Sequence, residues 1–164
     1  MIDDSLFVAR GANLSAIRCE VVVGARPSAV FDALASEDGV FAFLSAKSSI
    51  DLRIGGAYEI YFDEDAGPGQ RGSEGCQVLA YVPGRMLAVS WNAPPELPEA
   101  RRKRAWVVFL IDEIGEEGKS RLELHHTGLG ADGEWPEVKA YFEKAWPRFL
   151  VRIVERFELD AKPL

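Results

Sequence analysis

Apolar and polar residues alternate in the first patterned segment of the chain, residues 15–24, with the sequence SAIRCEVVVG. A two-residue period places alternate side chains on opposite faces, which is typical of a half-buried β-strand. The predicted inner face consists of Ile17, Cys19, Val21 and Val23. We therefore expect the folded chain to begin with a strand over residues 15–24.

The period then changes to that of a helix. Pro27 suits the first turn, and Val30, Phe31 and Leu34 follow at helical spacing. A second short helix is expected over residues 37–44. The pattern therefore predicts two consecutive short helices after the first strand.

Two strands are predicted around a Gly-Gly pair, over residues 48–54 and 57–63. A three-residue loop over 54–56 would pair Leu52 with Tyr58 and Ile50 with Ile60. That register places apolar side chains on one face, whereas a two-residue loop would mix charged with apolar partners. We therefore prefer the three-residue loop.

Four further strands are predicted over residues 74–81, 86–91, 104–112 and 121–127, followed by a helix over 134–158. Apolar residues recur every three or four positions along this helix, so one stripe faces the core. Pro147 predicts a kink or break near 143–146. This order indicates an α+β fold, in which one antiparallel sheet of six to seven strands packs against a long C-terminal helix. We expect a single domain over 15–164, preceded by an extension over 1–14.

Composition and charge narrow the classes of partner. The chain has 164 residues, a net charge of −7 and a pI of about 4.9. Nucleic acids and anionic membranes both attract clustered cations, so we expect neither as a partner. The basic cluster at 101–104 is interpreted as a solvated strand entrance. No signal peptide or membrane span is recognisable, and Cys19 and Cys76 are interpreted as buried thiols in a reducing cytoplasm.

His125 and His126 are the only histidines. Alternation places His126 on the face shared by Leu122 and Leu124, whereas His125 points to solvent. The role that we rank first for His126 is structural: a hydrogen bond to a backbone carbonyl or to a neighbouring strand. A ligand contact and acid–base catalysis follow in that order, because no catalytic partner is recognisable. No catalytic residue, metal ligand or cofactor is assigned, and the acidic run 63–65 is interpreted as a solvated loop.

The aromatic residues permit two interpretations, a filled core or the wall of a ligand cavity. Tyrosine and tryptophan supply both apolar area and a hydrogen-bonding tip. The candidate ligand-binding residues are Tyr58, Phe62, Trp91, His126, Phe142, Trp146 and Phe149.

Several short stretches, taken in order, resemble a known family. They are PSAVFDAL at 27–34, DLRIGG at 51–56, PGRML at 83–87 with Ser90-Trp91, LELHHTG at 122–128, and Ala145-Trp146. The chain is similar to the START-like, helix-grip SRPBCC superfamily and, within it, to the family of the C-terminal domain of the Hsp90 ATPase activator. The resemblance implies a curved sheet that grips a long helix around a hydrophobic cavity.

We therefore expect a cytoplasmic protein that binds a small hydrophobic or aromatic ligand. One alternative is an enzyme that acts on such a ligand with His126 as acid or base, which we rank lower. Another is a co-chaperone-like or stress-associated interaction module, although residues 1–14 are too short for the separate chaperone-contacting domain of the family's namesake. Residues 106–111 are apolar on both faces, so we expect loops or a second copy to cover the outer face, and we favour a homodimer.

Overall fold

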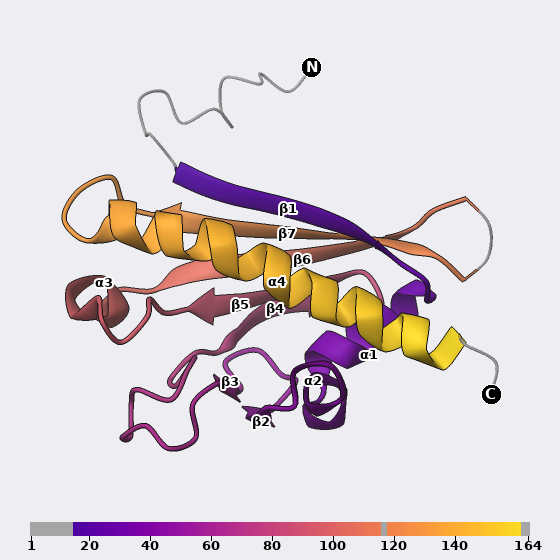
Figure 1. Cartoon of the computed structure of the whole chain (residues 1–164), viewed down its shortest axis with the longest axis horizontal. Coiled ribbons are helices and arrows are strands. Elements are labelled where there is room, and N and C mark those ends of the chain that lie inside the picture. The colour runs from indigo at the N-terminus through magenta and orange to yellow at the C-terminus, as the bar shows by residue number, and fades with distance from the viewer. Residues whose placement is uncertain (1–14, 116–117, 162–164) are drawn as a thin grey trace.

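The computed structural model describes residues 15–115 and 118–161, and the extension expected over 1–14 lies outside them. The described chain forms seven strands and four helices (Figure 1). In chain order these are β1 (Ser15–Val23), α1 (Pro27–Ala35), α2 (Glu37–Leu44), β2 (Lys47–Ile50), β3 (Tyr58–Tyr61), β4 (Val78–Val82), β5 (Met86–Trp91), α3 (Pro98–Arg102), β6 (Ala105–Glu113), β7 (Ser120–Leu129) and α4 (Trp135–Ala161).

Five antiparallel strands form the main sheet, in the order β1-β7-β6-β5-β4. Helix α4 lies across one face of this sheet (Figure 1). The side chains that face the helix alternate with outward ones, so Val107, Phe109 and Ile111 of β6 are buried while Trp106 and Leu110 are exposed. The expected α+β helix-grip architecture is confirmed.

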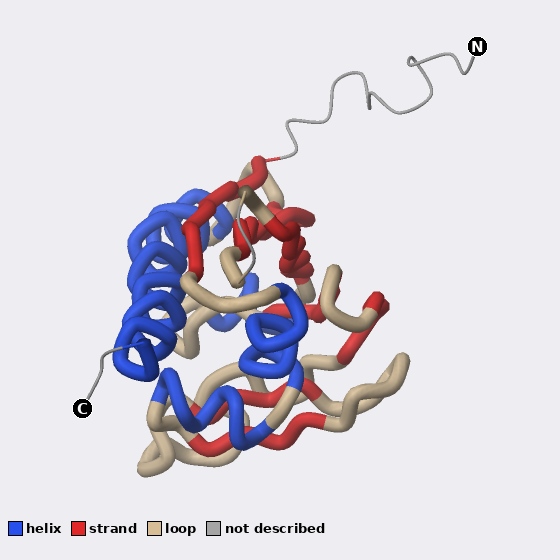
Figure 2. The backbone as a smooth tube through the Cα atoms, turned by 90° about the vertical axis from the view of Figure 1, so that its right-hand side faces the viewer, coloured by secondary structure: helices blue, strands red, loops and turns tan. Residues whose placement is uncertain are grey.

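Helices α1 and α2 close one end of the space between sheet and helix. Helix α1 packs against β5, β6 and β7, and α2 packs against α4. Figure 2 shows α4 along one side of the molecule, with the strands beside it. The core thus lies between a helical layer and the inner face of the sheet, where Leu34, Val40 and Leu150 are fully buried.

The prediction of one sheet with six to seven strands is wrong in one respect. Strands β2 and β3 pair with each other in a separate two-stranded sheet. Their register also differs from the prediction: Ile50 pairs with Tyr58, and Ser48 pairs with Ile60. The reason is the Gly-Gly pair. The amide of Gly55 donates to the Val78 carbonyl, and the Val78 amide donates to the Gly56 carbonyl. These bonds tie the segment to β4, so the connection between the two strands is longer than three residues.

A kink or a break was expected near 143–146, and the helix α4 continues through Pro147, so a break does not occur. Proline removes one intrahelical hydrogen bond. Buried side chains anchor the helix on both sides of it, since Trp146 precedes Pro147 and Phe149 and Leu150 follow it. Packing of this face outweighs the local cost of the proline.

Candidate functional site

Trp146 lies at the centre of an aromatic cluster beneath α4. Its ring centroid is 5.1 Å from that of Trp91 on β5, 5.4 Å from Phe142 and 5.3 Å from Phe149. Residues 142, 146 and 149 are three or four positions apart, so they share one face of the helix. The sequence periodicity that predicted a core-facing stripe therefore also assembles this cluster.

His126 lies under the same cluster, on β7. The indole Nε1 of Trp146 donates a hydrogen bond to its Nδ1 at 2.9 Å, which places the proton of the neutral imidazole on Nε2. His126 is buried, and this burial lowers its pKa to about 4. The predicted inward orientation of His126 is confirmed, but its partner is a side chain of α4 rather than a backbone carbonyl or a neighbouring strand. His125, expected in solvent, is half-buried and lies 3.0 Å from the Glu123 carboxylate.

An open cleft of about 870 Å³ runs along one side of α4. Its second wall is formed by the segment after β3 and by the loop after β5. Trp91, Phe142, Trp146 and Phe149 form an aromatic floor, each at most 7% exposed. Charged side chains complete the lining, among them Asp63, Arg71, Glu96, Arg101, Glu137, Arg148 and Arg152.

Five of the seven candidate ligand-binding residues line this cleft, namely Phe62, Trp91, Phe142, Trp146 and Phe149. Tyr58 and His126 do not. Tyr58 is fully buried, and its hydroxyl donates to the Leu34 carbonyl at 2.7 Å, which ties β3 to the end of α1. Burial raises the pKa of its phenol. Its hydrogen-bonding tip is therefore used inside the fold and not at the cleft.

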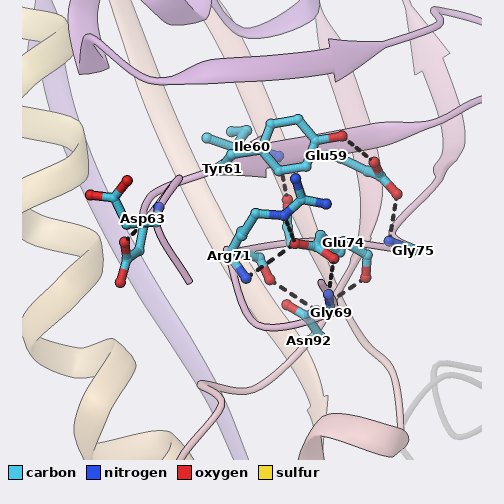
Figure 3. A network of polar contacts seen from close by, with 12 residues as sticks. Glu59, Ile60, Tyr61, Asp63, Gly69, Arg71, Glu74, Gly75 and Asn92 are labelled. Atoms are coloured by element: carbon cyan, nitrogen blue, oxygen red, sulfur yellow. Dashed lines mark hydrogen bonds and ion pairs between the residues drawn. The ribbon is translucent and has the colours of Figure 1, made fainter. Parts of the chain in front are cut away.

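A network of polar contacts fixes the wall opposite α4 (Figure 3). The Glu74 carboxylate accepts hydrogen bonds from the amides of Gly69 and Arg71 and pairs with the Arg71 guanidinium at 2.6 Å. Although burial acts to raise it, these bonds hold the pKa of the Glu74 carboxyl below its ordinary value. The guanidinium of Arg71 also lies 5.0 Å from the ring centroid of Tyr61. The Glu74 carboxylate thus holds the segment 69–74 in place.

Arg101 was not singled out by the sequence, which suggested a solvated basic cluster. Its guanidinium donates to the carbonyls of Gly69 and Gly72, each at 2.7 Å from Nη2, and to that of Ala93. It therefore joins the two loops that form the second wall. No sequence motif indicates this role, because the acceptors are backbone carbonyls supplied by distant segments.

The acidic run at 63–65 is exposed and lies outside the helices and strands, as expected of a solvated loop. Asp63 accepts a hydrogen bond from the amide of Asp65 at 3.2 Å, and Glu64 pairs with Lys47 at 3.0 Å. Glu64 thus connects this turn to β2, while Asp63 lies at the cleft. The cleft as a whole combines an aromatic floor with a charged rim, an arrangement suited to an apolar molecule that carries a polar group.

Comparison with known proteins identifies a family. Residues 24–158 match the model of the family described as Activator of Hsp90 ATPase homolog 1-like protein. No curated protein sequence matches the chain significantly.

Solved structures share the fold at low sequence identity. A Mesorhizobium loti protein is 18% identical with a TM-score of 0.62, over 92% of this chain and 100% of that one. The Aha1 dimer of Colwellia psychrerythraea is 17% identical with a TM-score of 0.57, over 88% and 97%. DynU16, described as a putative protein in the dynemicin biosynthetic locus, is 18% identical with a TM-score of 0.60, over 87% of this chain and 47% of that one.

Proposed function

Because the chain belongs to the Activator of Hsp90 ATPase homolog 1-like family, whose helix-grip fold it shares, we propose that it binds a small, largely apolar organic molecule in the cleft beside α4. The observation that carries this proposal is the aromatic floor of the cleft. Trp91 and Trp146 lie in contact there, with ring centroids 5.1 Å apart.

The dimensions of the cleft support the proposal. Its volume of about 870 Å³ falls in the range of roughly 300–1,000 Å³ typical of small-molecule sites. The network around Glu74 and Arg101 fixes the second wall, which reduces the ordering that a ligand would otherwise have to impose. A relative of the same fold is described as belonging to the dynemicin biosynthetic locus, a setting that supports an organic small molecule as the ligand class.

We do not propose His126 as an acid or base. It lies outside the lining of the cleft, and its Nδ1 is occupied by the indole of Trp146. With a pKa of about 4, it is a weak base at neutral pH. His126 instead supports the floor by holding Trp146 in place.

Paired substitutions on α4 test the proposal. Ala145 lines the cleft, whereas Ala140 is exposed on the same helix outside it. Native mass spectrometry and a thermal-shift screen of naphthalene- and indole-sized compounds should give hits with the native protein. Ligand at 100 times its Kd stabilises a folded protein by about 2.7 kcal/mol. Ala145→Phe should remove the shifts, and Ala140→Phe should keep them.

Shifts that persist in Ala145→Phe, with circular dichroism showing a native fold, would contradict the cleft as the site. A diverse screen without any hit would contradict the function itself.

We further propose that the chain forms a homodimer through the outer face of the sheet. Trp106 and Leu110 are 42% and 37% exposed on β6, and Leu110 pairs with Met86 of β5 on the same face. Among the described residues, no loop covers these side chains. The dimeric Colwellia psychrerythraea relative supports a second copy as the occupant. A different protein partner, as in a co-chaperone-like module, is the alternative.

We propose the cytoplasm as the location. Cys19 and Cys76 are both free thiols in the structure, which suits a reducing compartment. No described helix combines the length and apolar character needed to cross a membrane.

A further inference from the structure

Two arginines lie on the flank of α4 that faces the cleft. Arg148 and Arg152 are four residues apart, so they lie one above the other on the helix, and both line the cleft. Ala145 and Tyr141 continue the same flank toward the start of the helix. The wall therefore changes along its length from an aromatic hydroxyl to two guanidinium groups.

These guanidinium groups retain donors that the fold does not use. Within the described chain, Arg148 makes no hydrogen bond or ion pair. Arg152 donates from Nε to the Phe43 carbonyl at 3.0 Å, which leaves its two terminal nitrogens for another acceptor. Both side chains are exposed, so water solvates these donors in the absence of a ligand.

The other two arginines of the cleft differ in this respect. Arg71 pairs with Glu74, and Arg101 donates to backbone carbonyls of both loops. Their charges serve the structure of the second wall. Arg148 and Arg152 are therefore the cleft cations with capacity for an external anion.

The helix macrodipole does not explain the position of Arg148 and Arg152. Cations favour the last turn of a helix, because the dipole effect falls off beyond it. Arg152 is nine residues before the end of α4 at Ala161, about two and a half turns away.

Apart from Arg71 and Arg101, whose charges serve the second wall, acidic and basic side chains lie toward opposite ends of the cleft. Glu137 is eleven residues before Arg148 on α4, a rise of about 16 Å. Glu96 belongs to the loop next to α3, and the Ala100 amide of α3 donates to Glu134 just before α4 begins. These acids therefore lie toward the start of α4, while the arginines lie toward its later turns. Asp63, on the second wall, is the remaining acid of the lining.

Resting on the proposed function, we propose that the cleft selects molecules that join an aromatic body to a carboxylate. The aromatic body lies on Trp91, Phe142, Trp146 and Phe149. The carboxylate accepts hydrogen bonds from Arg148 and Arg152, whose planar guanidinium groups match its two oxygens. The excess of acidic over basic residues in the whole chain, 26 against 19, would disfavour such a ligand without this local pair.

Two matched probes test the selection, 2-naphthoate and its neutral analogue 2-naphthamide. Isothermal titration calorimetry at low ionic strength should show naphthoate binding about five- to tenfold more tightly. The double variant Arg148→Gln/Arg152→Gln should remove this difference by weakening naphthoate binding more than naphthamide binding, because only naphthoate carries a charge. Lys144→Gln is the control for the loss of a positive charge from the same helix, because Lys144 is exposed outside the cleft lining. It should leave both affinities unchanged.

The outcomes separate this inference from the proposed function. Equal affinity for both probes, or a preference for naphthoate that survives in the double variant, would overturn the role of the arginines while retaining the cleft as a site for apolar ligands. A loss of naphthoate preference in Lys144→Gln equal to that in the double variant would also overturn it, since long-range charge would then account for the effect. Failure of both probes to bind the native protein would contradict the inference and the proposed function together.

Discussion

The indole N–H of Trp146 and Nδ1 of His126 form a buried hydrogen bond of 2.9 Å between α4 and β7. Each ring is at most 2% exposed. The bond fixes the orientation of the tryptophan that forms the middle of the cleft floor. It also satisfies two polar atoms at a depth where an unpaired donor or acceptor would be costly.

Replacing one partner of this bond should cost more than its net contribution to stability. In His126→Leu the indole N–H is left buried without an acceptor, which should lower the free energy of unfolding by about 1–3 kcal/mol. Trp146→Phe should cost more, because it also removes buried volume. The double variant His126→Leu/Trp146→Phe should lose less free energy of unfolding than the sum of the losses in the two single variants. Urea unfolding of all four proteins measures the coupling, and strict additivity would show that the bond contributes nothing.

His126 is protonated only in the unfolded state when the pH lies between its folded and unfolded pKa values. The free energy of unfolding should therefore fall as the pH is lowered through this range. Burial lowers the pKa of His126 to about 4, whereas its unfolded value is about 6.5. Between these values the unfolded chain binds the extra proton, so the free energy of unfolding should drop by about 2–3 kcal/mol from pH 7.5 to pH 4.5. His126→Gln should flatten this dependence, and His125→Gln should not. A native-like slope in His126→Gln would assign the effect to other groups.

Carboxylates with a lowered pKa contribute to the pH dependence mainly at lower pH than His126. Hydrogen bonds hold the pKa of Glu74 below its ordinary value against the effect of burial, so the stability that Glu74 contributes is present above its unfolded pKa of about 4.3. That contribution is lost only as the pH falls toward its folded pKa. Glu123, whose pKa is also lowered by its hydrogen bond with His125, behaves in the same way. The comparison of the native protein with His126→Gln isolates the His126 contribution, because both carboxylates are present in each.

Arg101→Met should loosen the second wall of the cleft without unfolding the domain. It removes the donors to Gly69, Gly72 and Ala93 and leaves their carbonyls to water. Hydrogen exchange should rise in residues 66–73 and 92–97, with a loss of about 1–3 kcal/mol in global stability. Arg102→Met is the control. Within the described residues the ion pair of Arg102 is with exposed Glu99 alone, so its loss should cost under about 0.5 kcal/mol. Equal exchange in both variants would contradict the role of Arg101.

Gly128→Ala should be strongly destabilising. Gly128 has a φ of +77°, and a Cβ there would lie 2.3 Å from the Trp106 ring. Backbone strain and the clash should together cost about 2–4 kcal/mol. Gly133→Ala, at a φ of +60° with open space around it, should show only the backbone cost of about 1–2 kcal/mol. Thermal unfolding of the two variants compares these costs. Adding Trp106→Ala to Gly128→Ala removes the ring and should therefore remove the part of the cost that comes from the clash.

Leu110→Lys should convert the proposed dimer to a monomer. Leu110 lies between Met86 of β5 and Glu123 of β7. A lysine there would place a long charged side chain on the proposed contact surface, and its burial against a second copy would require desolvation. Val151→Lys provides the control, since Val151 is 47% exposed on α4, away from the outer face of the sheet. Sedimentation velocity at micromolar concentration should show dimers for the native protein and the control, and monomers for Leu110→Lys. Monomers in all three would contradict the homodimer.

Hydrophobic periodicity alone determined the order and type of most elements. The helix over 37–44 and the strand over 86–91 were predicted with the observed bounds. It also placed His126 and the α4 aromatics on inward faces, because the periods of 2 and 3.6 fix which side chains share a face. Five of the seven candidate residues consequently lie along one cleft.

The short helix α3 was not predicted, and the strand expected over 74–81 begins only at Val78. The two-residue change in the β2–β3 register kept Ile50 and Tyr58 on one face, so hydrophobic patterning does not distinguish the two registers. The hydrogen bonds of Val78, which accepts from the Gly55 amide and donates to the Gly56 carbonyl, favour the observed register.

The sequence by itself therefore determined which side chains face the core, because that information lies in local periodicity. Only the tertiary structure decided which hydrogen-bond partner each buried polar group has. Tyr58 donates to the Leu34 carbonyl, His126 accepts a hydrogen bond from the indole N–H of Trp146, and Arg101 joins two loops by donating to backbone carbonyls. These partners are 24, 20 and 32 residues apart in the chain. Such pairings depend on how distant segments pack, and a linear pattern of hydrophobic and polar residues carries no record of them.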